Sequence, residues 1–303
     1  MKVVFFSESQ VNGKIPRDFP NARTEYAWMM ALDAPHYNIN NIPNEKFDLG
    51  IIIIPKNNPN VDLDSFRDCC DKVAVMQEGP HWYFQDYSVE QQFHYYNTVV
   101  SSDWVYCHNE SDVNYYLGLG CKDVRVMRSL MIPDGLVSRN EWGDGTMIGG
   151  NFVSWYGGFD SYMVAREIGN SIWAPSMGRK QDQEDMIEDI NYMAYMSWRE
   201  WITALGQFNI GVHLMRTHAA GTFAMNCAFH GIPCIGYKGL DTQEILHPLT
   251  TVEVGDLDGA KEVARKLRSE RFYDLCSDTI LKRFEKNYTE EKWKENWRIT
   301  NGQ

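Results

Sequence analysis

Residues 216–236, RTHAAGTFAMNCAFHGIPCIG, are the stretch that indicates the fold most clearly. The pattern of residue types in this stretch changes three times within 21 positions. The apolar run that precedes them, residues 209–215, predicts a buried strand that ends at a turn of small and polar residues. A helix is expected from that turn to about His230, where Gly-Ile-Pro ends it, and residues 234–236 resume as a strand. A helix that opens at a glycine-containing turn exposes unpaired backbone N–H groups, and these can hold a diphosphate.

Strand and helix patterns alternate along the rest of the chain. In the first half we expect strands at residues 2–7, 37–42, 49–54, 72–77, 104–106 and 123–127, and helices at 23–33, with Asn21 as its cap, 61–70, 89–97 and 112–119. After a stretch rich in Gly, Asp and Pro, residues 132–145, the pattern restarts. There we expect strands at residues 151–155, 171–174 and 251–254, and helices at 161–169, 183–190, 198–205, 258–268 and 279–297.

This alternation, with apolar strands, predicts an α/β protein with two parallel sheets, each covered by helices on both faces. We expect one Rossmann-like domain at residues 1–135 and a second at residues 146–278, followed by a last helix at residues 279–303.

Composition limits the possible functions. The 303 residues suffice for two domains with their own cores, and the 44% of hydrophobic residues is typical of a folded chain. A net charge of −12 disfavours non-specific nucleic-acid binding. The seven cysteines lack C-x-x-C spacing and indicate reduced thiols in a cytoplasmic protein. We read the N-terminus, MKVVFFSESQ, as a strand rather than a signal peptide, and expect no membrane insertion.

Residues 226–233, NCAFHGIP, resemble the donor-sugar motif E-A-x-A-x-G-x-P of GT-B glycosyltransferases. Asn226 stands where that family usually has Glu. The size of the chain and an acidic residue after a strand of the first domain are similar to phage DNA β-glucosyltransferases. The E-x7-E pattern of the retaining group 1 transferases falls on His218 and Asn226, and neither is Glu.

The resemblance implies a hexosyltransferase that moves sugar from a nucleotide-sugar, such as UDP-glucose, to an acceptor hydroxyl. It also implies that residues 1–135 are the acceptor domain, that residues 146–278 are the nucleotide-sugar domain, and that the last helix, residues 279–303, returns to the first domain. The broken E-x7-E pattern favours inversion. The acceptor is either a glycan or a hydroxymethylated DNA base. A non-hydrolysing UDP-sugar epimerase and a catalytically inactive nucleotide-sugar binding protein are the alternatives.

An inverting enzyme needs a base, and one strand end offers two candidates. Residues 72–77 end at Glu78, and His81 lies three positions further on. The carboxyl ends of parallel strands form the crevice where ligands bind in such sheets. We therefore expect Glu78 or His81 to be catalytic. Trp82 and Tyr83 follow directly and are expected to stack on the acceptor.

The donor site is expected to combine glycines, helix-start amides and a cation. Gly157 and Gly158 permit close backbone approach to a phosphate. The turn from His218 to Gly221 and Thr222 presents N–H groups, and Asn226 accepts from the ribose. These positions are joined by Arg216 and Arg179, which are expected to neutralise the diphosphate. We expect no metal and no other cofactor, since no Cys/His pairs show ligand spacing, and a monomer or weak dimer.

Overall fold

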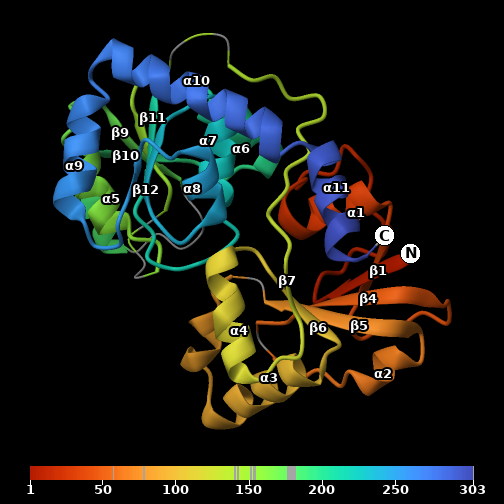
Figure 1. Ribbon diagram of the computed structural model, residues 1–303. Helices are drawn as coiled ribbons and strands as arrows, with labels where there is room; N and C mark the ends of the chain where they lie inside the picture. The colour runs from red at the N-terminus through yellow and green to blue at the C-terminus, as the bar shows by residue number, and fades with distance from the viewer. Residues whose placement is uncertain are drawn as a thin grey trace. The chain divides into compact units, whose positions relative to one another are not determined.

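The computed structural model describes residues 1–56, 58–77, 79–139, 141, 143–150, 152, 155–175 and 182–302. The chain divides into two compact units, which we call unit 1 and unit 2 (Figure 1). Unit 1 comprises Met1–Ile132, His218–Ala220 and Glu290–Gln303, and unit 2 comprises Pro133–Thr217 and Gly221–Thr289.

Unit 1 is built on a seven-stranded sheet in the order β2-β3-β1-β4-β5-β6-β7. Its strands are β1 Val3–Ser7, β2 Gly13–Lys14, β3 Pro35–Asn38, β4 Phe47–Ile54, β5 Cys70–Gln77, β6 Trp104–Cys107 and β7 Val124–Val126. All neighbouring pairs are parallel except the edge pair β2 and β3. The central strands are continuous apolar runs because helices cover both faces of a parallel sheet.

The helices of unit 1 pack on this sheet around aromatic residues. They are α1 Thr24–Leu32, α2 Asp64–Arg67, α3 Val89–Ser101, α4 Val113–Leu119, α11 Glu290–Thr300 and the 3-10 turns η1 His81–Asp86 and η2 Glu110–Asp112. Phe6 meets the edge of Phe66 at 4.8 Å between ring centroids, and Phe84 stacks on the fully buried Tyr95 at 4.5 Å.

Unit 2 is built on a six-stranded parallel sheet in the order β10-β9-β8-β11-β12-β13. Its strands are β8 Thr146–Ile148, β9 Ile172–Pro175, β10 Ile190–Met193, β11 Ile210–His213, β12 Cys234–Tyr237 and β13 Thr251–Val252. The chain starts in the middle at β8, runs outward to β10, and then crosses to β11 on the other side of β8. The strand order therefore reverses between β8 and β11, which is where doubly wound sheets bind their ligands.

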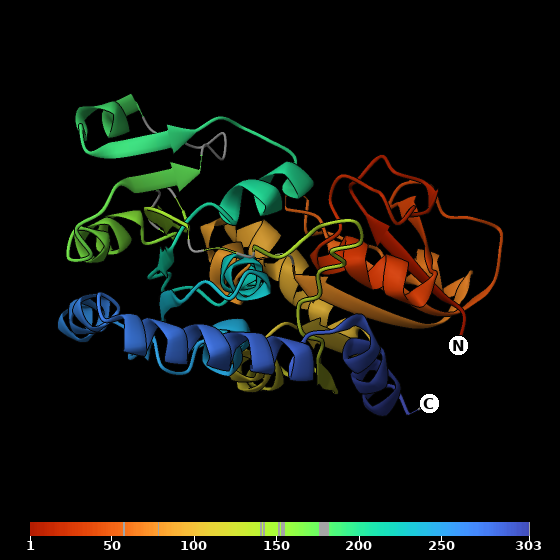
Figure 2. The ribbon, with the colours of Figure 1, turned by 90° about the horizontal axis from the view of Figure 1, so that it is seen from above.

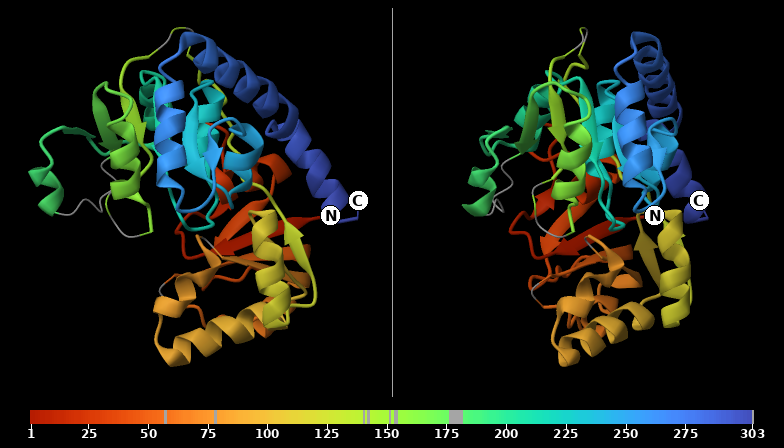
Figure 3. Two further views of the ribbon diagram at one scale, coloured as in Figure 1. Left: turned by 60° about the vertical axis from the view of Figure 1, so that its left-hand side comes forward. Right: turned by 90° about the vertical axis from the view of Figure 1, so that its left-hand side faces the viewer.

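The helices of unit 2 are α5 Gly158–Ala165, α6 Trp198–Leu205, α7 Thr222–Phe229, α8 Asp241–Leu246, α9 Leu257–Lys266, α10 Glu270–Asn287 and the 3-10 turn η3 Asp182–Met186. Figure 2 shows α10 running along α7 and α8. On another side of the unit, α5 and α9 lie side by side (Figure 3). No helix among the described residues is both long and apolar enough to cross a lipid bilayer.

The expected alternation is confirmed, and so are the parallel sheets and a C-terminal helix that belongs to unit 1. The predicted single helix over residues 279–297 is wrong, because two helices, α10 and α11, meet at Tyr288 and Thr289. The tail is polar on most of its surface, so the hydrophobic pattern did not reveal the break. Tyr288 is buried there, and its backbone N–H donates to the Phe284 carbonyl at the end of α10.

Four other expectations differ from the structure. Only Asp64–Arg67 of residues 61–70 is helical, and Cys70 already starts β5. The predicted helix at 183–190 is the 3-10 turn η3 followed by β10, which the sequence pattern did not show. Asn21 does not cap α1 and instead accepts a hydrogen bond from Arg23. The strand expected at 151–155 falls partly outside the described residues, and the strand in that region is β8.

Candidate active site

Two neighbouring parallel strands of unit 1 end beside the same polar cluster. β5 pairs with β6 in parallel, with Ala74 opposite Trp104, so their carboxyl ends lie at one edge of the sheet. His81 opens η1 a few residues after β5, and Asp112 closes η2 after β6. The His81 Nδ1 atom lies 3.1 Å from Asp112 Oδ1.

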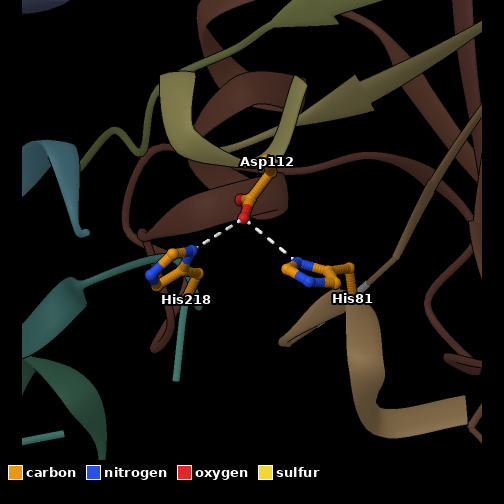
Figure 4. Close-up of side chains that lie close together, drawn as sticks. All are labelled: His81, Asp112 and His218. Atoms are coloured by element: carbon orange, nitrogen blue, oxygen red, sulfur yellow. Dashed lines mark hydrogen bonds and ion pairs between the residues drawn. The ribbon is translucent and has the colours of Figure 1, made fainter. Parts of the chain in front are cut away.

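The third member of the cluster is His218, from the tripeptide His218–Ala220 that packs within unit 1. Its Nδ1 atom also lies 3.1 Å from Asp112 Oδ1, so both imidazoles point at one carboxylate oxygen (Figure 4). The Ser111 hydroxyl is a further partner of His218 Nδ1, at 3.1 Å. The two histidine rings are 6.1 Å apart between centroids and nearly perpendicular.

The backbone around this cluster is held by side chains of unit 1. The Asn109 amide donates to Asp112 Oδ2 at 3.0 Å and to the Ala219 carbonyl at 3.0 Å. Asn109 therefore ties the carboxylate to the segment that carries His218. The Ser129 hydroxyl donates to the carbonyl of Ala220 in the same segment. These hydrogen bonds hold the Asp112 carboxylate and the segment that carries His218 next to each other.

Electrostatics keep Asp112 ionised although its side chain is only 6% exposed. Burial alone would raise the pKa of this carboxyl, but hydrogen bonds from His218, His81 and Asn109 outweigh burial and lower the pKa to about 2. A carboxylate that accepts from Nδ1–H leaves the opposite ring atom, Nε2, as the proton acceptor. His81 also stacks on Tyr115, at 4.0 Å between ring centroids.

The chemistry available to this cluster is general acid–base catalysis. An imidazole oriented by a buried carboxylate can take a proton from a hydroxyl at neutral pH, and the carboxylate stabilises the imidazolium that forms. The His81 and His218 side chains are 17% and 27% exposed, so both remain accessible.

In unit 2, Gly157 and Gly158 follow β8 at the point where the strand order reverses. Gly157 caps α5 in the left-handed region, with φ 62°, and a Cβ atom there would lie 2.1 Å from the Leu214 carbonyl oxygen. Only glycine allows α5 to start this close to the end of β11. Among the residues that the structure describes, no side chain caps the first turn of α5.

Arg216 lies near the same helix. Its guanidinium pairs with Asp160 of α5 at 3.0 Å, and its side chain is 62% exposed. The hydrogen bond that Arg216 donates to the Asp160 carboxylate raises the pKa of Arg216. The structure thus brings Gly157, Gly158 and Arg216 together at one end of the unit 2 sheet.

Gly221 and Thr222 form the start of α7, after β11. Gly221 caps the helix with φ 65°, and here too no side chain of the described residues caps the first turn. Asn226 lies one turn further and is 1% exposed. With its amide suitably oriented, its nitrogen donates to the Thr222 carbonyl at 3.1 Å and its oxygen accepts from Trp201 at 3.2 Å. A ribose contact by Asn226 would require it to leave these partners, so that role stays a prediction.

Three predicted site residues lie outside what the structure describes. These are Glu78, Arg179 and the side chain of Trp82. Tyr83 is described, is partly buried, and meets the Tyr87 ring edge-on at 5.8 Å. Acceptor contacts of Trp82 and Tyr83 therefore stay predictions.

Sequence reasoning missed Asp112. It was expected only as the first residue of a helix at 112–119, whereas its carboxylate is the centre of the cluster. The available signal was its position shortly after the strand at 104–106, one strand away from His81. His218 was expected at the donor phosphates, but in the structure it contacts Asp112 of unit 1.

No protein-family model matches the sequence, and no curated protein matches it either. Solved structures of GT-B glycosyltransferases match its fold. An α-glucosyltransferase in complex with UDP and a 13-mer DNA containing an HMU base matches with a TM-score of 0.62 and 14% identity, over 99% of both chains. HepE from Anabaena in complex with UDP matches with a TM-score of 0.64 and 8% identity, over 100% of this chain and 99% of that one.

TarM from S. aureus, in a complex that includes UDP, matches with a TM-score of 0.63 and 10% identity over 86% of this chain. The present chain spans about half of TarM, with 56% of that chain covered. The fold is therefore that of the GT-B glycosyltransferases, with two Rossmann-like units and a C-terminal helix on the first.

Proposed function

We propose that this protein is a glycosyltransferase that moves a hexosyl group from a UDP-hexose to an acceptor hydroxyl. The observation that carries the proposal is the point in unit 2 where the strand order reverses. Two helices, α5 and α7, begin there at left-handed glycines, and no side chain in the described part of the chain caps either of them. Uncapped helix N-termini at such a point favour a diphosphate. UDP is the ligand of the solved structures with the same fold.

In this proposal unit 2 holds the donor. The backbone N–H groups after Gly157, Gly158 and Gly221 donate hydrogen bonds to the diphosphate oxygens, and the Thr222 hydroxyl adds a further donor. Arg216 neutralises charge on the leaving UDP by exchanging its partner Asp160 for a phosphate. Arg179 is proposed to assist it. Residues 1–135 are proposed as the acceptor domain and residues 146–278 as the donor domain.

Unit 1 is proposed to supply the base. The acceptor hydroxyl gives its proton to His81 Nε2, its oxygen bonds to the anomeric carbon, and the bond from that carbon to the diphosphate breaks. Asp112 holds the ring and stabilises its positive charge. The acceptor oxygen attacks the anomeric carbon on the face opposite the leaving diphosphate, which gives inversion. Glu78 is the other proposed base, on its position after β5.

The acceptor is proposed to be a glycan hydroxyl or a hydroxymethylated base in DNA, with Trp82 and Tyr83 stacking on it. A DNA acceptor requires cationic contacts with phosphates, so its binding would weaken steeply as salt increases. Glycan binding would change little over the same range. The charge of −12 favours the glycan, and the fold shared with an α-glucosyltransferase solved in complex with DNA containing an HMU base favours the DNA acceptor.

The deciding experiment measures UDP release from a panel of UDP-hexoses, with glycan acceptors and with hydroxymethylated DNA, followed by NMR of the anomeric proton of the product. We expect acceptor-dependent UDP release and an inverted anomeric centre. Conversion of the donor sugar without acceptor would identify the epimerase. Binding of UDP-sugars without turnover on any acceptor would identify the inactive binding protein.

The two candidate bases are separated by the variants Glu78→Gln and His81→Gln, each compared with His94→Gln on α3. If His81 is the base, His81→Gln should lose at least about a hundredfold in kcat and still bind UDP. Glu78→Gln should then stay active. The reverse result assigns the base to Glu78. Wild-type rates in both variants would remove the acid–base assignment altogether.

A further inference from the structure

We propose that His81, Asp112 and His218 form a binding site for a divalent transition-metal ion, best filled by Zn²⁺, and that the bound ion switches the enzyme off. The part of the proposal that concerns inhibition rests on the proposed transferase function. Binding of the metal ion does not depend on that function.

The ligand atoms are already gathered. His81 Nδ1, His218 Nδ1 and an Asp112 carboxylate oxygen lie within 4.8 Å of one another. Each imidazole nitrogen is 3.1 Å from Asp112 Oδ1. Ligands at about 2.0–2.1 Å from a tetrahedral zinc ion are separated by roughly 3.3 Å, so only small side-chain shifts are needed to admit the ion.

The type and number of ligands select the metal. Two imidazoles and one carboxylate suit Zn²⁺, Co²⁺ and Ni²⁺, whereas Mg²⁺ and Ca²⁺ prefer sites made of oxygen atoms alone. Three protein ligands leave at least one position for water, which is typical of exchangeable sites rather than closed structural ones. The partial exposure of both histidines gives the ion a route from solvent.

Hydrogen bonds from Asn109 support the site. Asn109 donates to the Asp112 oxygen that does not face the histidines, and it also fixes the Ala219 carbonyl next to His218. Hydrogen bonds of this kind orient metal ligands and raise affinity. The sequence could not show the site, because 31 residues separate His81 from Asp112 and 106 separate Asp112 from His218.

Inhibition follows from the tautomers of imidazole. In the metal-free cluster, Asp112 accepts from Nδ1–H and leaves His81 Nε2 free to take a proton. A metal ion on Nδ1 requires that nitrogen to be unprotonated, so the hydrogen of the neutral ring moves to Nε2. Nε2 then carries a proton already and cannot act as the base.

Binding is tested on the full-length, chelator-treated protein by titration with Co²⁺, read from the visible d–d absorption, and with Zn²⁺ by calorimetry. We expect one ion per chain and no thiolate-to-cobalt charge-transfer band, since the seven cysteines are buried. His81→Ala and His218→Ala should each weaken binding at least tenfold, and Asn109→Ala should weaken it about tenfold. His94→Ala is the matched control and should bind like the wild type.

A Co²⁺ stoichiometry below one, or an affinity that is unchanged in both cluster variants, would overturn the site. Thermal unfolding of each variant establishes that it is folded. If His81→Ala does not fold, Asp112→Asn provides the same comparison with a side chain of equal size.

Inhibition is tested by UDP release with and without Zn²⁺. We expect Zn²⁺ to stop transfer in the wild type and in His94→Ala, and a chelator to restore it. Full transfer with the site loaded would refute the inhibitory role. Absence of transfer under every condition, together with tight Co²⁺ binding, would refute the proposed function and leave the metal site standing.

Discussion

His230 and His247 of unit 2 are buried in a fixed neutral form. In His247, Nδ1 accepts from the Cys234 N–H at 3.2 Å and Nε2 donates to the Ala224 carbonyl at 2.8 Å. In His230, Nδ1 accepts from the Arg139 N–H and Nε2 faces the Ile202 carbonyl. Each ring uses one nitrogen as acceptor and the other as donor, so a second proton would break a backbone hydrogen bond.

These histidines predict loss of stability in acid. Burial lowers the pKa of His230, His247 and His213 to about 4. A histidine in the unfolded chain has a pKa of about 6.5, so between these values the unfolded state binds more protons. The stability contribution of the neutral rings is complete above pH 6.5 and is lost as the pH falls toward 4.

We expect the free energy of unfolding to fall by about 1 kcal/mol or more per histidine between pH 7 and pH 5, measured by urea titration at each pH. His247→Gln should flatten this dependence, because glutamine keeps a donor and an acceptor but does not titrate. His94→Gln in unit 1 should retain the wild-type slope. A slope that His247→Gln leaves unchanged would count against this account.

The element on which the proposed donor site depends is α7, and its start requires glycine for two reasons. Gly221 has φ 65°, and a Cβ atom at this position would lie 1.9 Å from Thr242 Oγ1 of α8. The turn and the packing of α7 against α8 therefore select the same residue. The sequence predicted the helix start correctly from the glycine, but it could not show that the glycine is also enclosed by another helix.

Gly221→Ala should lower the free energy of unfolding by roughly 2–4 kcal/mol, from the left-handed backbone and the collision together. Gly255→Ala has a similar backbone angle, φ 86°, with open space around it. It should cost only about 1 kcal/mol. Adding Thr242→Ala to Gly221→Ala should recover part of the loss in urea unfolding. Equal losses of unfolding free energy in Gly221→Ala and Gly255→Ala would disprove the collision with Thr242.

At the scale of the whole molecule, α11 completes unit 1 from the far end of the chain. Trp293 stacks near Trp28 of α1, at 6.0 Å between ring centroids, and on Trp297 at 5.8 Å. The indoles of Trp28 and Trp293 donate to the same carbonyl, that of Arg128, at 3.1 and 3.0 Å. The core of the first half is therefore incomplete without the last residues.

Trp293→Ala should lower the stability of unit 1 by about 3–5 kcal/mol, as expected when a buried tryptophan is truncated. Trp293→Phe keeps much of the packing, loses the hydrogen bond to Arg128, and should cost less. Ile299→Ala on the same helix removes a side chain that is 71% exposed and should change stability by less than about 0.5 kcal/mol. Urea midpoints that rise from Trp293→Ala through Trp293→Phe to Ile299→Ala would support the role of α11. A Trp293→Ala midpoint near that of Ile299→Ala would refute it.

The sequence by itself determined the two α/β halves, the turn after β11 and the helix that follows it. Apolar runs, glycines and prolines act through local sterics and local burial, which are written in consecutive residues. The contacts of His81, Asp112 and His218, the buried amide of Asn226 and the break between α10 and α11 became known only from the folded structure. Each of these features depends on which loops the sheet brings to one edge and on which faces other elements cover. Hydrophobic periodicity along the chain does not encode such long-range contacts.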